Sequence, residues 1–309
     1  MSSKVRRSVD KAVSYFRANQ STTGGSGASG QTATTTPWVV QAIAAAGANA
    51  STFERSGGKS PIAYLQSLDI EREATGGSGT TSNPANFYAK MIVTYHAAKV
   101  SSLIAKAGSK HIDLAASLLA YENSQNGAFS TTPGGSGTYA AISTTAWAVI
   151  ALRAAGRSPS QLASSVSWLA SQQGSDGGFS FTPGGSPDPD DTAAAVEALR
   201  AGGVSASNAT IKHALSYLHS QQMSNGGFTS GMGGTTNAES TAWAVQAIRA
   251  VGQNPTGAAW KKGGKTPIAF LLSLQARSGA FYHYGTTLAM PLLTTSQVVV
   301  ALSGKTYPF

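Results

Sequence analysis

The sequence predicts an all-α fold, a closed (α/α)6 toroid in which six helix-pair repeats form a single domain over residues 1–309. A nearly all-apolar segment recurs six times, a second helical segment precedes each copy, and a Gly-rich loop usually lies between them. Repeats of about 20–50 residues typify proteins built from stacked supersecondary units. No break in composition separates the units, and one domain is therefore expected.

The apolar segments align on one position, which recurs at intervals of 49, 60, 47, 49 and 54 residues. This position holds Trp38, Phe87, Trp147, Ala194, Trp243 and Gln297. The segments, of which TAWAVIALRAAG is typical, have almost no polar face. Because a helix that is apolar nearly all round must be buried on most sides, they are expected to form an inner ring.

The segments that precede them, such as VDKAVSYFRANQ and IKHALSYLHSQQ, carry charged residues and are expected to form an outer ring. Two of them, at 60–68 and 266–275, begin with a Ser or Thr cap followed by proline at the first helical position. The last unit, SQVVVALSGKTYPF, is apolar, and packing against the first unit would bury it.

The repeat is clearest over residues 167–203. The outer helix is expected to stop at Gln172-Gln173, because the Gly177-Gly178 pair that follows is costly in a helix. Good capping residues at 188–192 start the inner helix, and Gly202-Gly203 ends it.

Composition excludes several classes of site. A net charge of +9 with only 11% charged residues indicates a thinly charged surface without a dense basic patch, so no nucleic-acid partner is expected. No run approaches the ~18 apolar residues of a transmembrane segment. The absence of cysteine excludes Cys-based metal centres, and the histidines lack metal-ligand spacing, so neither a metal nor a cofactor is expected.

Scarce charge, no cysteine and abundant Gly, Ser and Thr suit a soluble exported protein whose signal peptide is absent from this chain. A cytoplasmic location is the alternative, and the pattern indicates no particular oligomeric state.

An aromatic-Leu helix, Gln, Gly-Gly-Phe and a Thr-Ala helix follow one another in the repeats. This pattern resembles the prenyltransferase and squalene-oxidase repeat in its QW-motif form, over nearly the whole chain. The resemblance implies the toroid of squalene–hopene cyclases, other class II terpene cyclases and protein prenyltransferases. A weaker similarity links it to the cobalamin carriers transcobalamin and intrinsic factor. The resemblance to the cyclases and prenyltransferases implies an apolar small-molecule partner, namely an isoprenoid-type ligand in a central apolar cavity.

The segment Asp188-Pro189-Asp190-Asp191-Thr192-Ala193 is similar to the DxDDTA signature, the DxDD motif of class II terpene cyclases. The resemblance implies that Asp190 protonates an alkene or epoxide, while Asp188 and Asp191 hold and tune it. Carboxyl groups crowded together have raised pKa values and can stay protonated. Family members usually add a histidine beside the acid, for which both His96 and His283 are candidates. The single barrel departs from most class II cyclases.

The three aspartates also fit two other interpretations, a helix cap and a calcium site. The equivalent positions of the next unit hold Asn237, Glu239 and Ser240, so the acids also fit a helix-capping consensus. A calcium site on the three carboxylates is the other alternative.

A second set of candidates comes from the inner segments. Polar residues within apolar helices must be paired or face a wet cavity. For Lys90 and Glu197 this leaves two possibilities: the two side chains meet across the lumen, or they line a ligand site. The predicted ligand-binding residues are Trp38, Phe87, Lys90, His96, Trp147, Glu197, Trp243 and Gln246. The alternative is that these residues belong to the core and bond to neighbouring helices.

Three functions remain open from the sequence. The first is a class II terpene cyclase-like enzyme, an isomerase or lyase that acts through Asp190. The others are a non-catalytic carrier of a corrinoid or another lipophilic ligand, and an extracellular structural repeat domain.

Overall fold

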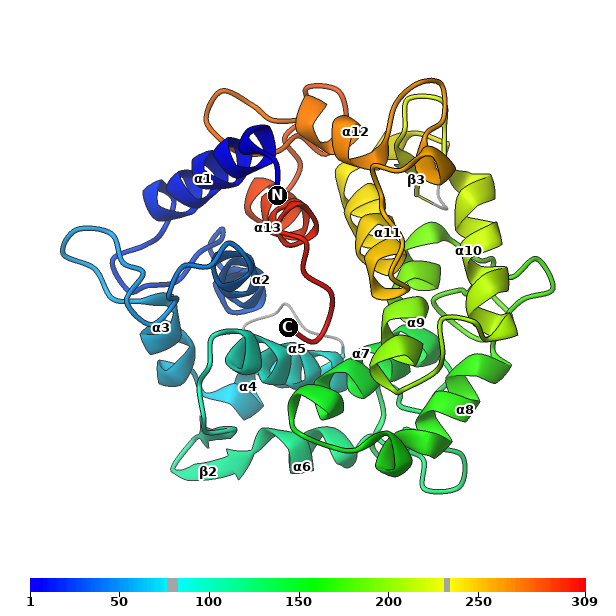
Figure 1. Cartoon of the computed structure of the whole chain (residues 1–309). Helices are drawn as coiled ribbons and strands as arrows, with labels where there is room; N and C mark the ends of the chain where they lie inside the picture. Colours follow the sequence, from blue (N-terminus) through cyan, green and yellow to red (C-terminus); the bar gives the residue numbers. More distant parts are fainter. Residues whose placement is uncertain (77–82, 231–233) are drawn as a thin grey trace.

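The computed structural model describes residues 1–76, 83–230 and 234–309, and helices dominate these ranges. Within them, six helices form an inner ring (Figure 1). These are α2 (Thr32–Ala45), α5 (Pro84–Ala97), α7 (Ala141–Ala154), α9 (Pro189–Ala201), α11 (Ala238–Ala250) and α13 (Pro291–Leu302). The outer helices are α1 (Ser3–Ala18), α3 (Pro61–Ser67), α6 (Leu114–Leu119), α8 (Ala163–Ser171), α10 (Ala209–Gln221) and α12 (Pro267–Ser273).

Smaller elements connect the pairs. Helix α4 (Ile70–Ala74) precedes α5, and three 3-10 turns lie at Pro133–Gly135, Pro159–Leu162 and Ala258–Trp260 in the described chain. Strands β1 (Ile104–Ala107) and β2 (Lys110–Asp113) form one antiparallel hairpin, and β3 (Phe228–Thr229) pairs with β4 (Thr236–Asn237) in another.

Each inner helix packs against the next one in the chain, and α13 packs against both α2 and α1. The first and last repeats therefore meet, as Figure 1 shows. The inner helices are buried nearly all round; in α7 every residue from Ala141 to Leu152 is buried. The all-α toroid predicted from the sequence is confirmed. None of the helices in the described ranges is both long and apolar enough to cross a membrane.

A threonine near the start of the inner helix holds the Gly-rich loop of its repeat. In α9, Thr192 Oγ1 accepts a hydrogen bond of 2.8 Å from the backbone N–H of Phe179, which is fully buried. The same bond joins Thr145 to Phe129, Thr241 to Phe228 and Thr295 to Phe281. The Gly-aromatic motif thus inserts a phenyl ring between the inner and outer rings while its backbone polar group stays paired.

A glutamine at the end of an outer helix joins one repeat to the next. Gln173 Nε2 donates to the carbonyl oxygens of Gly177, at 2.9 Å, and of Thr210 in the next outer helix, at 2.8 Å. In the last repeat Gln275 Nε2 donates to Ser8 O at 2.8 Å, and Ser8 Oγ donates back to Gln275 Oε1 at 2.8 Å. The same contact that joins neighbouring repeats therefore also joins the last outer helix to the first.

The glycine of this contact is expected to be essential for stability. Gly177 has a φ of +88°, and a Cβ placed on it would lie 2.5 Å from the carbonyl oxygen of His213 in α10. We expect Gly177→Ala to destabilise the protein by about 2 kcal/mol or more, measured as a lower midpoint of denaturant unfolding. Gly184→Ala is the matched control, since its φ is +77° but nothing lies within 4 Å of the added carbon. Equal effects of the two substitutions would contradict a tight contact at Gly177.

Candidate functional site

The first turns of the inner helices meet at one end of the ring. Asn83, the cap of α5, donates from Nδ2 to Thr144 Oγ1 in α7 at 2.8 Å. Ser143 of α7 lies beside Asp191 of α9, and Asp190 lies beside Ser240 of α11. Glu239 of α11 reaches Thr294 of α13. We call this series the polar belt; its members are Asn83, Ser143, Thr144, Asp190, Asp191, Glu239, Ser240 and Thr294.

The three aspartates have different positions in the belt. Asp188 is the cap of α9, and its carboxylate accepts a 2.8 Å hydrogen bond from the backbone N–H of Asp191. Asp190 and Asp191 lie in the first turn itself. Because Asp188 already caps the helix, capping does not account for Asp190.

The pKa of Asp190 is raised to about 7, chiefly by burial and also by the negative charges of Asp188 and Glu239. The neighbouring Ser240 hydroxyl and His283 act in the opposite direction on this pKa, without cancelling the effect of burial. Burial and the charges of Asp188 and Asp190 also raise the pKa of Asp191. Within the described residues, the buried Oδ1 of Asp190 has no hydrogen-bond partner. Asp190 and Asp191 therefore retain protons near neutral pH more readily than free aspartates, as expected for largely buried carboxyl groups that lie close together.

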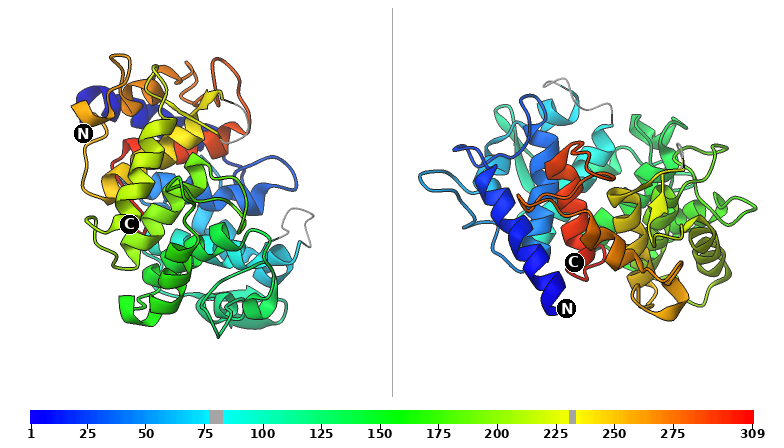
Figure 2. Two further views of the ribbon diagram at one scale, coloured as in Figure 1. Left: turned by 90° about the vertical axis from the view of Figure 1, so that its right-hand side faces the viewer. Right: turned by 90° about the horizontal axis from the view of Figure 1, so that it is seen from above.

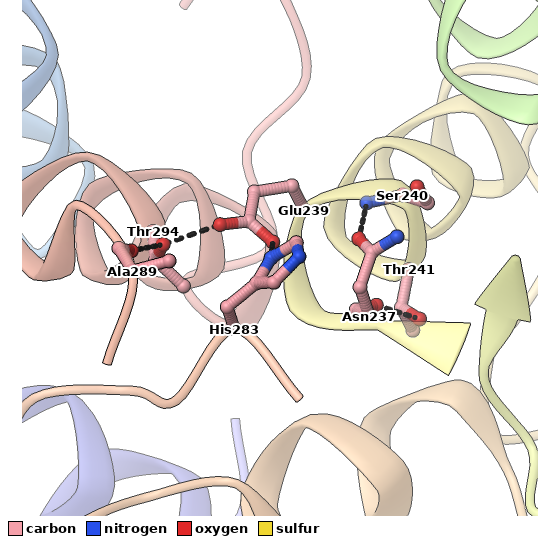
Figure 3. A network of polar contacts seen from close by, with 7 residues as sticks. All are labelled: Asn237, Glu239, Ser240, Thr241, His283, Ala289 and Thr294. Carbon is pink, nitrogen blue, oxygen red and sulfur yellow. Dashed lines mark hydrogen bonds and ion pairs between the residues drawn. The ribbon is translucent and has the colours of Figure 1, made fainter. Parts of the chain in front are cut away.

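Figure 3 shows the part of the belt next to Asp190. His283 Nδ1 lies 2.6 Å from Glu239 Oε2, and Thr294 Oγ1 bonds to the other oxygen of the same carboxylate. Thr294 Oγ1 is also 2.9 Å from the carbonyl oxygen of Ala289. Asn237 caps α11 by accepting the N–H of Ser240 at 2.8 Å. Glu239 is thus held by α13 and by the loop that precedes it.

The structure distinguishes between the two histidines that the sequence offered as partners of Asp190. His283 lies close enough to influence Asp190 and is bonded to Glu239. His96 is exposed in the last turn of α5, so it lies apart from the other predicted ligand-binding residues. Sequence reasoning did not include Glu239 or Thr294 in the site. A signal for Glu239 existed, since it occupies the repeat position of Asp190, 49 residues later.

A cavity of about 710 Å³ opens at the same end of the ring, between α1, α2, α5 and α13. Three predicted ligand-binding residues line it: Trp38, Phe87 and Lys90. Leu292 and Leu293 of α13 add apolar wall, and its polar lining includes Gln31, Thr34, Asn83 and Asn86. The aspartates do not line this cavity. The two sites adjoin at α13, where Leu293 faces the cavity and the next residue, Thr294, bonds to Glu239.

The centre of the ring is filled by aromatic side chains. Trp147 contacts Trp38 and Trp243 edge to face, with ring centroids 5.4 and 5.6 Å apart. These three residues come from helices that are not neighbours in the ring, so they close the lumen at this level. Tyr307 completes the cluster, 5.4 Å from Trp147 and 5.7 Å from Trp243.

Tyr307 belongs to the segment after α13, which runs into the middle of the ring in Figure 1. Its hydroxyl donates to Gln41 Oε1 at 2.7 Å, and its backbone N–H donates to Glu197 Oε2 at 2.7 Å. Both termini lie on one face of the ring (Figure 2), the end at which the inner helices finish. The segment therefore fills the lumen from the end opposite the cavity. Sequence reasoning did not identify Tyr307 as a partner of these residues.

Besides His96, four of the predicted ligand-binding residues do not line the cavity. Trp147, Trp243 and Glu197 contact Tyr307, and Gln246 Nε2 donates to Ala242 O of its own helix at 3.3 Å. Burial raises the pKa of Glu197 to about 8. The prediction that Lys90 and Glu197 meet across the lumen is not supported, because no ion pair joins them in the part of the chain that the structure describes.

Across residues 1–76, 83–230 and 234–309, no group of three or more His, Cys, Asp or Glu residues is arranged to hold a metal ion. The aspartate cluster therefore offers no calcium geometry.

Comparison with known proteins places this geometry in context. A family model described as the prenyltransferase alpha-alpha toroid domain matches residues 2–188 and 192–290. No curated protein sequence matches the chain.

Solved structures with different activities share the fold. A variant of the type II terpene cyclase MstE from Scytonema, in complex with its substrate geranylgeranyl dihydroxybenzoate, is 16% identical, with a TM-score of 0.65 over 97% of each chain. The ent-copalyl diphosphate synthase from Streptomyces platensis is 18% identical, with a TM-score of 0.57 over 88% of this chain and 50% of that chain. A glycosidase in complex with glucose is 12% identical, with a TM-score of 0.60 over 98% of each chain. These similarities show the fold, and the site must distinguish between the chemistries.

Proposed function

Since the chain belongs to the prenyltransferase alpha-alpha toroid domain family, we propose that it binds an isoprenoid-type ligand and cyclises it by class II terpene cyclase chemistry. In this proposal Asp190 is the catalytic acid, and the cavity lined by Trp38 and Phe87 holds one part of the ligand. Because the aspartates do not line this cavity, the reacting end of the ligand must extend along the first turn of α13 to Asp190. The type II terpene cyclase MstE, which has the same fold, takes geranylgeranyl dihydroxybenzoate as its substrate, and this supports the choice of ligand.

The observation that carries the proposal is the state of Asp190. With a pKa of about 7, roughly half of the Asp190 carboxyl groups carry a proton in neutral solution, far more than for a free aspartate, and Oδ1 has no partner among the described residues. Asp188 performs the capping role that would otherwise explain an aspartate at this position. A general acid works best when its pKa lies near the operating pH.

In the proposed reaction Asp190 transfers a proton to the ligand, and the neighbours of Asp190 act before and after this step. The proton passes from the Asp190 carboxyl to one carbon of a C=C bond, whose π electrons form the new C–H bond and leave a carbocation. Further double bonds attack that cation, and loss of a proton ends the reaction. Before transfer, Asp188 and Glu239 keep the proton on Asp190 by charge repulsion. Afterwards, Ser240, His283 and the N-terminus of α9 stabilise the carboxylate.

The test is turnover of linear isoprenoids. Squalene, geranylgeranyl diphosphate and geranylgeranyl dihydroxybenzoate are incubated with the protein, and products are separated by chromatography and identified by mass spectrometry and NMR. Cyclisation yields isomers with the mass of the substrate and fewer double bonds. If no substrate yields a cyclic product, the enzyme proposal fails. The cavity then supports a carrier of a lipophilic ligand, which mass spectrometry of co-purified molecules would identify.

The pH dependence of turnover should follow the protonation of Asp190. The titratable groups around it are Asp188, Asp191, Glu239 and His283, contributed by α9, α11 and the loop before α13. Because the acid form is the active one, turnover should be greatest below pH 7 and fall about tenfold per pH unit well above it. A rate that is constant from pH 6 to 9 with chemistry limiting would exclude Asp190 as the acid.

A further inference from the structure

Lys90 is a cation on the wall of the cavity, only partly exposed to solvent, that has no acidic partner among the described residues. Its ammonium nitrogen lies 5.0 Å from the centre of the Trp38 ring and 5.5 Å from that of Trp147. No Asp or Glu oxygen forms an ion pair with it in the described part of the chain. Glu197, the acid predicted to meet it, instead accepts the backbone N–H of Tyr307.

Such an arrangement is costly unless something compensates the charge. Removing an ammonium group from water carries a penalty of several kcal/mol, and two aromatic faces recover only about 1–2 kcal/mol each. Burial lowers the pKa of Lys90 to about 8, so the side chain still carries its proton in neutral solution. A positive charge therefore lies against the cavity without a counter-ion from the chain.

The cavity around Lys90 has a polar and an apolar side. Asn86, one turn before Lys90 in α5, also lines the cavity, and its side-chain amide nitrogen is a hydrogen-bond donor that an anion can accept from. Phe87, Leu292 and Leu293 supply apolar wall. The volume of about 710 Å³ lies in the ~300–1,000 Å³ range of small-molecule sites. A ligand that matches this lining has one anionic end and a long apolar body.

We propose that Lys90, with Asn86, is an anion-binding subsite that holds the carboxylate or phosphate end of an amphipathic isoprenoid. The apolar body of the ligand lies along Phe87 and the first turn of α13, towards the polar belt. This inference rests on the proposed isoprenoid ligand and adds the chemistry of its polar end. An uncharged hydrocarbon such as squalene would leave Lys90 without a counter-ion and is therefore the poorer ligand.

Binding, measured by calorimetry, tests the subsite in an Asp190→Asn background, so that turnover does not interfere. Three probes share one C20 chain: geranylgeranyl diphosphate, geranylgeranoic acid and geranylgeraniol. We expect at least one anion to bind ~10-fold or more tightly than the alcohol, because an ion pair with a partly buried amine is worth more than a neutral contact. Preference for the diphosphate would identify a phosphate ester as the natural end group, and preference for the acid a carboxylate.

Lys90→Met then removes the charge and keeps most of the side-chain length. We expect the affinity for the two anions to fall to the affinity for the alcohol, and the affinity for the alcohol itself to stay the same. The melting temperature should be no lower than that of the Asp190→Asn protein. Lys212→Met, on the exposed face of α10, is the matched control and should leave all affinities unchanged.

The outcomes distinguish the two proposals. If Lys90→Met retains the preference for an anion, or if the alcohol binds as tightly as both anions, the subsite is overturned while the isoprenoid cavity stands. If none of the three probes binds, the isoprenoid ligand itself is overturned, and the subsite with it.

Discussion

Asp190→Asn is expected to reduce cyclisation by about 100- to 10,000-fold, the usual contribution of a general acid, while the protein stays folded. Asn is close in size to Asp and leaves the cap of α9 intact, because the cap is Asp188. The amide, however, cannot supply a proton to a double bond. Turnover of the best isoprenoid substrate, measured beside the melting temperature, checks both parts of this expectation.

The same substitution should change how stability depends on pH. The pKa of Asp190 is about 7 in the folded protein, above the value of about 3.9 for an aspartate in an unfolded chain. Between these values the folded state binds more protons than the unfolded state, so this group makes the wild-type protein less stable as pH rises. Asn does not titrate. The melting temperature of Asp190→Asn relative to wild type should therefore increase from pH 5 to pH 8.

The matched control is Asp113→Asn, which makes the same chemical change at the exposed cap of α6. It should leave turnover unchanged. Glu239→Gln is not a neutral control, even though Glu239 has the same repeat position as Asp190, because it bonds to His283 and lies beside Asp190. Full activity in Asp190→Asn would leave Asp190 as a first-turn residue of α9 without a catalytic role.

Tyr307→Ala is expected to destabilise the protein by about 3–5 kcal/mol, the usual cost of truncating a buried aromatic residue. Its ring packs against Trp147 and Trp243 in the centre of the toroid, where no neighbouring side chain is free to fill the space. The loss of its hydroxyl also leaves the buried Oε1 of Gln41 without its donor, while Gln41 Nε2 still donates to Thr94 Oγ1. The midpoint of denaturant unfolding measures the effect.

Two variants separate the contributions of Tyr307. Tyr307→Phe keeps the ring and removes the hydrogen bond, so it should cost only about 1 kcal/mol. Tyr139→Ala removes an exposed ring and should have a small effect. If Tyr307→Ala is as stable as wild type, the segment after α13 does not contribute to the core of the ring.

Local sequence patterns were sufficient for the repeats. The inner helices are apolar nearly all round because each one packs against two neighbouring inner helices and against the outer ring. This burial is visible in the sequence of each repeat as a segment without a polar face. A glycine and the Phe that follows it mark the loop. The glycine is needed for a positive φ and the Phe fills a buried pocket, and each of these requirements can be recognised from a single residue. The grouping of Asp188, Asp190 and Asp191 was likewise available, because the three are nearly consecutive.

Contacts between repeats required the tertiary structure. Glu239 meets His283 and Thr294 only because the first turns of α11 and α13 lie at the same height in the ring. The position of the cavity in the lumen depends on the course of the segment that carries Tyr307, because this segment fills the opposite end. Trp38 and Trp243 occupy the same repeat position, yet only Trp38 lines the cavity. Repeat position specifies which face of a helix a residue occupies, whereas its surroundings depend on side chains that come from distant parts of the chain.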